Sequence, residues 1–206
     1  MSTSDRRVLL VDTAIDLIAT KGIRALTHRA LDTALDLPAG SCSYYFRTRR
    51  ALLEAIADRI AERSRADFTA ARLGTPTPEA SGTDGLDSRG AFDPDLVARA
   101  IAVWVDRLLA DRCNHLLARH ALLAELRSDP ELRARLAHGL FSVEHARELF
   151  RTTASADPQT AAADFVAVLE GAVFDRFTGN RTHLTPGSQA SVDQLTNLLV
   201  VYLRAR

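Results

Sequence analysis

The residue types that could do chemistry gather between Thr27 and Arg50. Small, hydroxylic and aromatic residues form the run Ala-Gly-Ser-Cys-Ser-Tyr-Tyr-Phe, which ends at Phe46, and the cationic run Arg-Thr-Arg-Arg follows directly. Hydroxyl and aromatic groups can contact bases and sugars, while guanidinium groups pair with phosphates. A short helix, a turn, a second short helix and a basic cluster, in that order, are typical of a helix-turn-helix. We therefore expect this segment to bind DNA.

Charge is unevenly divided along the chain. The 206 residues carry no net charge, but residues 1–66 hold 11 Lys and Arg against 8 Asp and Glu, whereas the remainder holds 15 against 18. A basic N-terminal part suits a local phosphate contact, and zero net charge argues against indiscriminate polyanion binding.

Helices must position these residues, because apolar side chains recur at helical spacing and no strand-like alternation competes. Thr27 can cap the first helix of the motif, Pro38 suits the first turn of the second, and Thr48 can begin a long helix that reaches about residue 73. Asp-Pro pairs and one Thr-Pro pair predict further helices at 94–111, 113–127, 130–153, 158–178 and 187–205. We expect an all-α fold of about nine helices, with a Pro-, Gly- and Ser-rich flexible loop at about 74–93.

Several classes are disfavoured by composition. No run of 18 apolar residues and no signal peptide is found, so we expect a cytoplasmic protein without membrane association. Cys42 and Cys113 are isolated, and His115 and His120 are poorly spaced for one helix face, so we expect no disulfide, metal or cofactor. A redox role for Cys42 stays open.

The segment from Gly22 to Leu53 resembles the tetracycline-repressor (TetR) family of bacterial transcriptional regulators. The resemblance is carried by Gly-Ile-Arg-Ala-Leu-Thr ending at Thr27, Gly-Ser-Cys-Ser-Tyr-Tyr-Phe ending at Phe46, and Arg-Arg-Ala-Leu-Leu ending at Leu53. It implies a DNA-binding domain at 1–50 and a helical domain at 51–206 for a small-molecule effector and for dimerisation. The chain departs from the family pattern at Asp36, Pro38 and Ser43, where glycine, serine and tyrosine are usual.

Individual DNA-binding roles follow from this resemblance. Thr27 and Arg49 match phosphate contacts, Arg29 matches a position that can reach a base edge, and His28 and Arg47 lie near phosphate. Positions that face the major groove are matched by Ala39, Gly40, Ser41, Ser43, Tyr44 and Tyr45. Tyr44 and Tyr45 could instead pack against the helical body.

The expected effector pocket and dimer surface lie in the second half. Polar or aromatic groups interrupt apolar helices at Trp104, His120, Phe141 and Glu144, which we take as pocket candidates for a largely apolar effector. Ordinary core or surface roles remain open for each. Because the last two helices are apolar on more than one side, we expect a homodimer through Phe165, Leu169, Val173, Phe177, Leu195, Leu199 and Tyr202.

These observations together favour a dimeric, ligand-responsive repressor of a pseudo-palindromic DNA operator. A helical enzyme or small-molecule carrier that keeps the head as a scaffold is the alternative from another class, although the sequence offers no nucleophile–base pair, carboxylate dyad or phosphate loop to support it. The sequence does not separate a repressor from an activator, and it does not identify the effector or the operator.

Overall fold

The computed structural model describes residues 2–71, 92–137, 141–153 and 155–204. Within these ranges the regular structure is helical, without a β-strand, which confirms the expected all-α class. The segment 74–93, expected to be a loop, lies outside the described residues except for its last two positions. None of the described helices combines the length and the apolar composition needed to cross a bilayer.

Ten α-helices make up the described parts of the chain. They are α1 (Thr3–Lys21), α2 (His28–Ala34), α3 (Ser41–Tyr45), α4 (Arg49–Ala71), α5 (Pro94–Asp111), α6 (Cys113–Glu125), α7 (Pro130–Ala137), α8 (Val143–Thr152), α9 (Pro158–Thr178) and α10 (Gln189–Arg204). Short 3-10 turns at Ile23–Ala25 and Leu126–Ser128 follow α1 and α6.

Three predicted helix boundaries were wrong. The single helix expected at 130–153 is two helices, because Ser142 begins α8 with extended backbone and a side chain that accepts a hydrogen bond from the His145 N–H. The second helix of the motif begins at Ser41 and not near Pro38, since Gly40 before it has a left-handed backbone. Likewise α10 begins at Gln189 and not at residue 187, where Gly187 has a positive φ of 84°.

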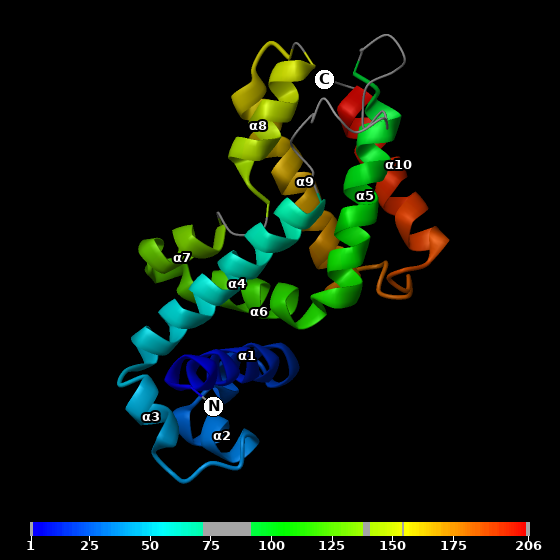
Figure 1. Cartoon of the computed structure of the whole chain (residues 1–206). Helices are drawn as coiled ribbons and strands as arrows, with labels where there is room; N and C mark the ends of the chain where they lie inside the picture. Colours follow the sequence, from blue (N-terminus) through cyan, green and yellow to red (C-terminus); the bar gives the residue numbers. More distant parts are fainter. Residues whose placement is uncertain (1, 72–91, 138–140, 154, 205–206) are drawn as a thin grey trace. The chain divides into compact units, whose positions relative to one another are not determined.

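The chain divides into two compact units. The first unit comprises Met1–Ala66 and Cys113–Leu140. In it α1 packs against α6, and the short α2 packs against α3 (Figure 1). Its core includes Leu31 of α2, Cys42 of α3 and Phe46, so apolar packing holds the predicted helix-turn-helix together.

The second unit comprises Asp67–Arg112 and Phe141–Arg206. Within it α5 runs beside α10 and α8 lies beside α9 (Figure 1). The predicted Asp-Pro starts are confirmed here: Asp93 accepts from the N–H groups of Asp95 and Leu96, and Asp157 accepts from that of Thr160. These caps depend on neighbours within one helical turn, which is why the sequence reveals them.

Candidate functional site

A buried carboxylate holds the turn between α2 and α3. The two oxygens of Asp32 accept hydrogen bonds from the backbone N–H groups of Gly40 and Cys42, both at 2.8 Å, and the residue is 4% exposed. Backbone donors replace the water that the carboxylate loses on burial. Asp32 therefore fixes the start of α3 from a position in α2, a role that the residue pattern did not indicate.

The turn also accommodates Asp36 where the family usually has glycine. Asp36 has a φ of 50°, in the left-handed region. Asp and Asn enter this region more readily than other L residues. The turn closes in spite of the substitution, because the Leu37 N–H donates to the Asp32 carbonyl at 2.8 Å.

The short helix α3 has a buried and an exposed face. Cys42 lies in the core, whereas Ser43 is exposed and Tyr44 is 79% exposed. Tyr45 is half-buried, and its ring meets that of Tyr44 edge-on with 5.2 Å between centroids. Packing on one face thus leaves a hydroxyl and a phenol pointing outward on the other.

Arg7 of α1 supports the end of α3, a role that sequence reasoning missed. Its guanidinium donates to the Tyr45 carbonyl at 2.7 Å and lies 4.4 Å from the centroid of the Phe46 ring. A cation at a helix C-terminus satisfies a free carbonyl and interacts favourably with the helix dipole. Since Arg7 and Tyr45 are 38 residues apart, no local pattern pairs them.

The cations predicted to meet phosphate fall into two groups. Arg29 and Arg47 are exposed and form no hydrogen bond or ion pair with the described residues. Arg49, by contrast, donates to the backbone carbonyls of Leu26 at 2.6 Å and Ile23 at 3.3 Å. Arg29 and Arg47 are therefore available for a phosphate or base, while Arg49 braces the loop before α2.

The other predicted contacts lie on the same α2–turn–α3 segment. Thr27 caps α2, because its hydroxyl oxygen accepts a backbone N–H at 3.0 Å. His28 is half-buried, and Ala39 and Gly40 are exposed in the turn before α3. The hydroxyl of Ser41 donates to a carbonyl of that turn at 2.6 Å. Contact of these residues with DNA stays a prediction.

Two of the four effector candidates meet in the second unit. The rings of Trp104 and Phe141 are perpendicular, with 5.6 Å between centroids. Phe68, at the end of α4, lies 5.6 Å from Trp104, and His145 stacks on Phe68 at 4.4 Å. We call these four residues the aromatic cluster. Phe68 was not predicted, because the pattern of α4 does not show which helix its last turn meets.

The other two candidates have different surroundings. Glu144 is exposed and forms an ion pair with Arg147, one turn further along α8. His120 belongs to the first compact unit, whereas Trp104 and Phe141 belong to the second. A shared site for all four stays a prediction.

Trp104 carries a buried hydrogen-bond donor. The residue is 7% exposed, and its indole Nε1–H finds no acceptor among the described residues. A buried N–H left without a partner costs about 1–3 kcal/mol.

The residues predicted for the dimer surface contribute mainly to the core of one protomer. Five of the seven are buried within the second unit, namely Phe165, Leu169, Val173, Leu195 and Leu199. Phe177 and Tyr202 are half-buried, and Tyr202 donates to the Ala161 carbonyl at 2.8 Å. The large apolar side chains that α9 and α10 expose are Phe174, Leu198 and Val201. Helix periodicity locates these stripes but does not say which stripe the protomer covers.

A buried polar network joins α5, α9 and α10. The Ser191 hydroxyl donates to Asp106 and accepts from Arg176 at 2.8 Å, while Arg176 also donates to Gln194 at 2.8 Å. Burial lowers the pKa of the Arg176 guanidinium, against the opposing effect of Asp106. The network orients the helices on which a dimer would depend.

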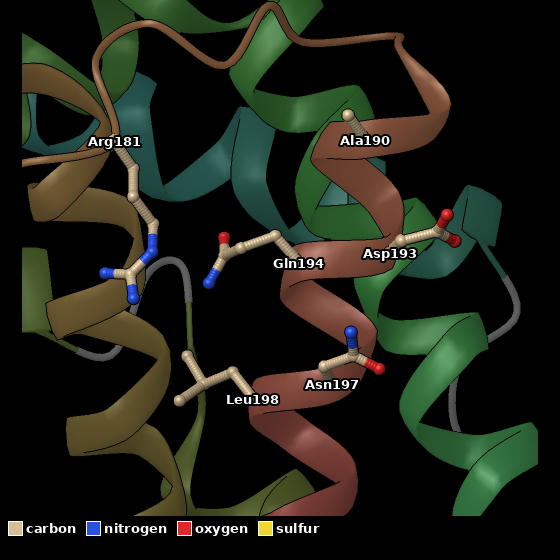
Figure 2. A pocket seen from close by; sticks show the side chains of 6 residues that line it. All are labelled: Arg181, Ala190, Asp193, Gln194, Asn197 and Leu198. Atoms are coloured by element: carbon tan, nitrogen blue, oxygen red, sulfur yellow. The ribbon is translucent and has the colours of Figure 1, made fainter.

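A surface pocket of about 520 Å³ lies beside this network. Its lining residues come from the loop after α9 and from α10: Arg181, Ala190, Asp193, Gln194, Asn197 and Leu198. Figure 2 shows Gln194 and Leu198 extending from α10 toward Arg181. None of the predicted effector residues lines this pocket.

Comparison with known proteins links both halves of the chain to one family. A family model for bacterial regulatory proteins of the tetR family matches residues 10–56. A model for tetracyclin repressor-like C-terminal domains matches residues 92–201. A search of curated proteins found no match.

Solved structures agree with these matches. The multidrug binding protein EbrR, complexed with malachite green, is 27% identical, with 94% of this chain and 97% of that chain covered and a TM-score of 0.61. A TetR-family member from Streptomyces coelicolor A3 is 23% identical over 96% and 98% of the chains, with a TM-score of 0.62. A putative TetR-family regulator from Rhodococcus sp. is 21% identical over 97% and 99%, with a TM-score of 0.69. The last two, at this identity, show the shared fold alone.

Proposed function

Since the chain belongs to the TetR family of bacterial regulatory proteins, we propose that it is a homodimeric repressor. In this proposal it binds a pseudo-palindromic DNA operator and is released from it by a small-molecule effector. Because it binds DNA in this proposal, we expect the protein to act in the cytoplasm.

One observation carries the DNA-binding part of the proposal. Tyr44 and Ser43 face outward on α3, and two unpaired cations, Arg29 and Arg47, lie on α2 and just after α3. Phenol and hydroxyl groups can contact sugar, phosphate or base edges, and free guanidinium groups pair with phosphate or guanine. We infer that α3 enters the major groove and that the arginines bind at or beside it.

The dimer part of the proposal rests on the apolar residues that the second unit leaves exposed. Phe174 of α9 is 51% exposed in the protomer and Val201 of α10 is 72% exposed. The small residues Ala163, Ala167 and Gly171 share the exposed side of α9. Small residues let two helices approach closely. In such a two-fold dimer the two heads would have to enter successive major grooves, whose half-sites lie about 34–36 Å apart.

The effector part is supported by the family of the C-terminal domain and by one structural neighbour. EbrR was solved with malachite green and also with ethidium, so a similar fold accommodates aromatic compounds. Release requires the effector to bind the DNA-free form better by about 1–3 kcal/mol. The single helix α4 runs from the DNA-binding head into the second unit and offers a route for this coupling.

Selection from genomic DNA tests the proposal. Fragments of the source genome are incubated with the protein at about 0.15 M salt, where weak binding through phosphates alone is suppressed. We expect enrichment of one inverted repeat. Absence of any enriched sequence from a folded, dimeric sample would contradict sequence-specific regulation.

Alanine variants then identify the DNA-binding residues. Arg29→Ala and Tyr44→Ala are each expected to weaken binding to the selected operator about 10- to 100-fold, the usual loss for one base or phosphate contact. Arg107→Ala is the matched control, because Arg107 is an exposed arginine of α5 in the second unit. Equal losses in Arg29→Ala and Arg107→Ala would mean that general charge, and not the α2–α3 segment, governs affinity.

A further inference from the structure

We propose that Trp104 donates the directed hydrogen bond of an effector site walled by Phe68, Phe141 and His145, and that this site takes a planar aromatic ligand with a neutral oxygen or nitrogen acceptor. The proposal rests on the function above only in calling the ligand an effector. The binding chemistry itself stands on the aromatic cluster.

The indole N–H defines the first requirement of the ligand. Trp104 is more than nine-tenths buried, and its Nε1 has no acceptor among the described residues. At 7% exposure, bulk water has little access to this donor. A ligand with an acceptor at this point satisfies the donor, whereas a hydrocarbon of the same shape leaves it unpaired.

The neighbouring rings define the shape of the ligand. Phe68 and Phe141 each meet Trp104 nearly at right angles, with interplanar angles of 83° and 90°. His145 stacks on Phe68 with an interplanar angle of 18°. Flat aromatic surfaces favour an aromatic partner that can stack on one ring and meet another edge-on.

Ring contacts also connect the donor with the surface. His145 is exposed, Phe68 is half-buried and Trp104 is buried, so the three rings form a continuous series from solvent to core. Movement of the exposed His145 side chain would open the series at its outer end. In the proposal, an incoming ligand displaces the exposed His145 ring first and enters from this side.

The charge of the acceptor is limited by the surroundings. The two rings that contact Trp104, those of Phe68 and Phe141, carry no charge, and Arg147 on the neighbouring α8 is paired with Glu144. Burial of a carboxylate without a partner cation is costly. A neutral carbonyl, ether or ring nitrogen therefore suits the site better than an anion.

A matched pair of probes tests the requirement for an acceptor. 9-Fluorenone and fluorene share one tricyclic skeleton, but only fluorenone carries a carbonyl oxygen. Titration calorimetry on the full chain is expected to show about tenfold tighter binding of fluorenone, the size of one satisfied buried donor. Trp104 is the chain's single tryptophan, so its fluorescence reports from this site alone and should change on binding.

Replacement of one atom then tests the role of Trp104. Growth with 3-benzothienylalanine in place of tryptophan exchanges the indole N–H for sulfur at this position alone, and the bicyclic ring is kept. We expect fluorenone to lose its preference, so that the two affinities become about equal. A tenfold preference that survives the exchange, equal affinities in the native protein, or no binding of fluorenone at all would each overturn the proposal.

The outcome is independent of DNA binding. If the genomic selection fails but fluorenone binds through the indole N–H, the ligand site is supported and the proposed regulatory function is contradicted. If an operator is found but fluorenone and fluorene bind equally, the proposed regulatory function is supported and the proposed ligand site is contradicted.

Discussion

At the scale of single residues, the α2–α3 segment depends on groups that touch no DNA in the proposed function. Asp32 holds two backbone N–H groups at the start of α3, and Arg7 holds a carbonyl at its end. A helix of five residues cannot be stable alone. Its presentation to the major groove therefore relies on these two tertiary contacts.

Asp32→Ala is expected to lower the free energy of unfolding by about 2–4 kcal/mol, because two buried N–H groups lose their acceptor. Asp32→Asn keeps one amide oxygen as an acceptor and should lower the free energy of unfolding by a smaller amount. Urea unfolding measures both variants, and operator affinity should fall in the same order. Equal stability of the alanine variant and the native protein would mean that water replaces the carboxylate.

The thiol of Cys42 is expected to be unreactive in the folded protein. Burial, assisted by the nearby Asp32 charge, raises the pKa of this thiol from 9.0 to about 11, and only a thiolate reacts readily. Iodoacetamide followed by peptide mass spectrometry should find Cys113, which is half-exposed, labelled before Cys42. Rapid native labelling of Cys42 would instead revive a redox role for it.

The raised pKa of the Cys42 thiol also affects the stability of the fold at alkaline pH. The unfolded thiol ionises near pH 9, whereas the folded one stays protonated until about pH 11. The contribution of Cys42 to stability is therefore complete below pH 9 and is lost as the pH rises toward 11.

At the scale of elements, a network of ion pairs ties α4 to α7. Arg50 contacts Asp129 at 2.5 Å and Glu131 at 3.1 Å, and Arg135 of α7 contacts Asp58 of α4 at 3.2 Å. The sequence places Arg50 in a cationic run, but in the structure Arg50 forms ion pairs with carboxylates. Hydrogen bonding from the Leu132 N–H, helped by Arg50, lowers the pKa of Asp129.

Removal of Arg50 should reveal an electrostatic link between these helices. Arg50→Met is expected to lower the Tm at low salt, and the difference should shrink in 1 M NaCl, where the Debye length is about 3 Å. Arg107→Met, which breaks a single pair within α5, should change the Tm less. A loss that is the same at both salt concentrations would show that the Arg50 side chain acts by packing.

At the scale of the whole molecule, the proposed dimer depends on which apolar residues stay exposed. Leu195 and Leu199 of α10 are fully buried in the protomer, while Val201 on the same helix is 72% exposed. An isologous dimer interface would have to use exposed residues such as Val201, because Leu195 and Leu199 are already covered within the protomer.

A charge at Val201 should therefore break the dimer. Val201→Arg is expected to give a monomer in light scattering coupled to size-exclusion chromatography, because an arginine would lose its water without gaining a partner. Val103→Arg on α5 is the matched control, since Val103 is also exposed, and it should remain dimeric. If Val201→Arg stays dimeric and Val103→Arg does not, the interface lies on α5.

The DNA-binding segment and most helices were predictable from sequence because their signals are local. Asp93 and Asp157 cap helices whose first N–H groups lie within three residues, and an apolar period shows in any window of a few turns. The same locality explains the errors. Residues 130–153 keep a helical composition on both sides of Ser142, so their period does not show that one helix ends and another begins.

Only the tertiary structure decided which groups meet across the chain. Asp32 with Cys42, Arg7 with Tyr45, and Phe68 with Trp104 are contacts between different helices, and residue spacing carries no information about them. Burial is decided in the same way: Leu199 and Val201 are both apolar residues of α10, yet neighbours from other helices cover Leu199 and leave Val201 exposed. The sequence by itself therefore determined the helices and the family, and packing between helices determined which side chains remain available for DNA, a ligand or a second copy.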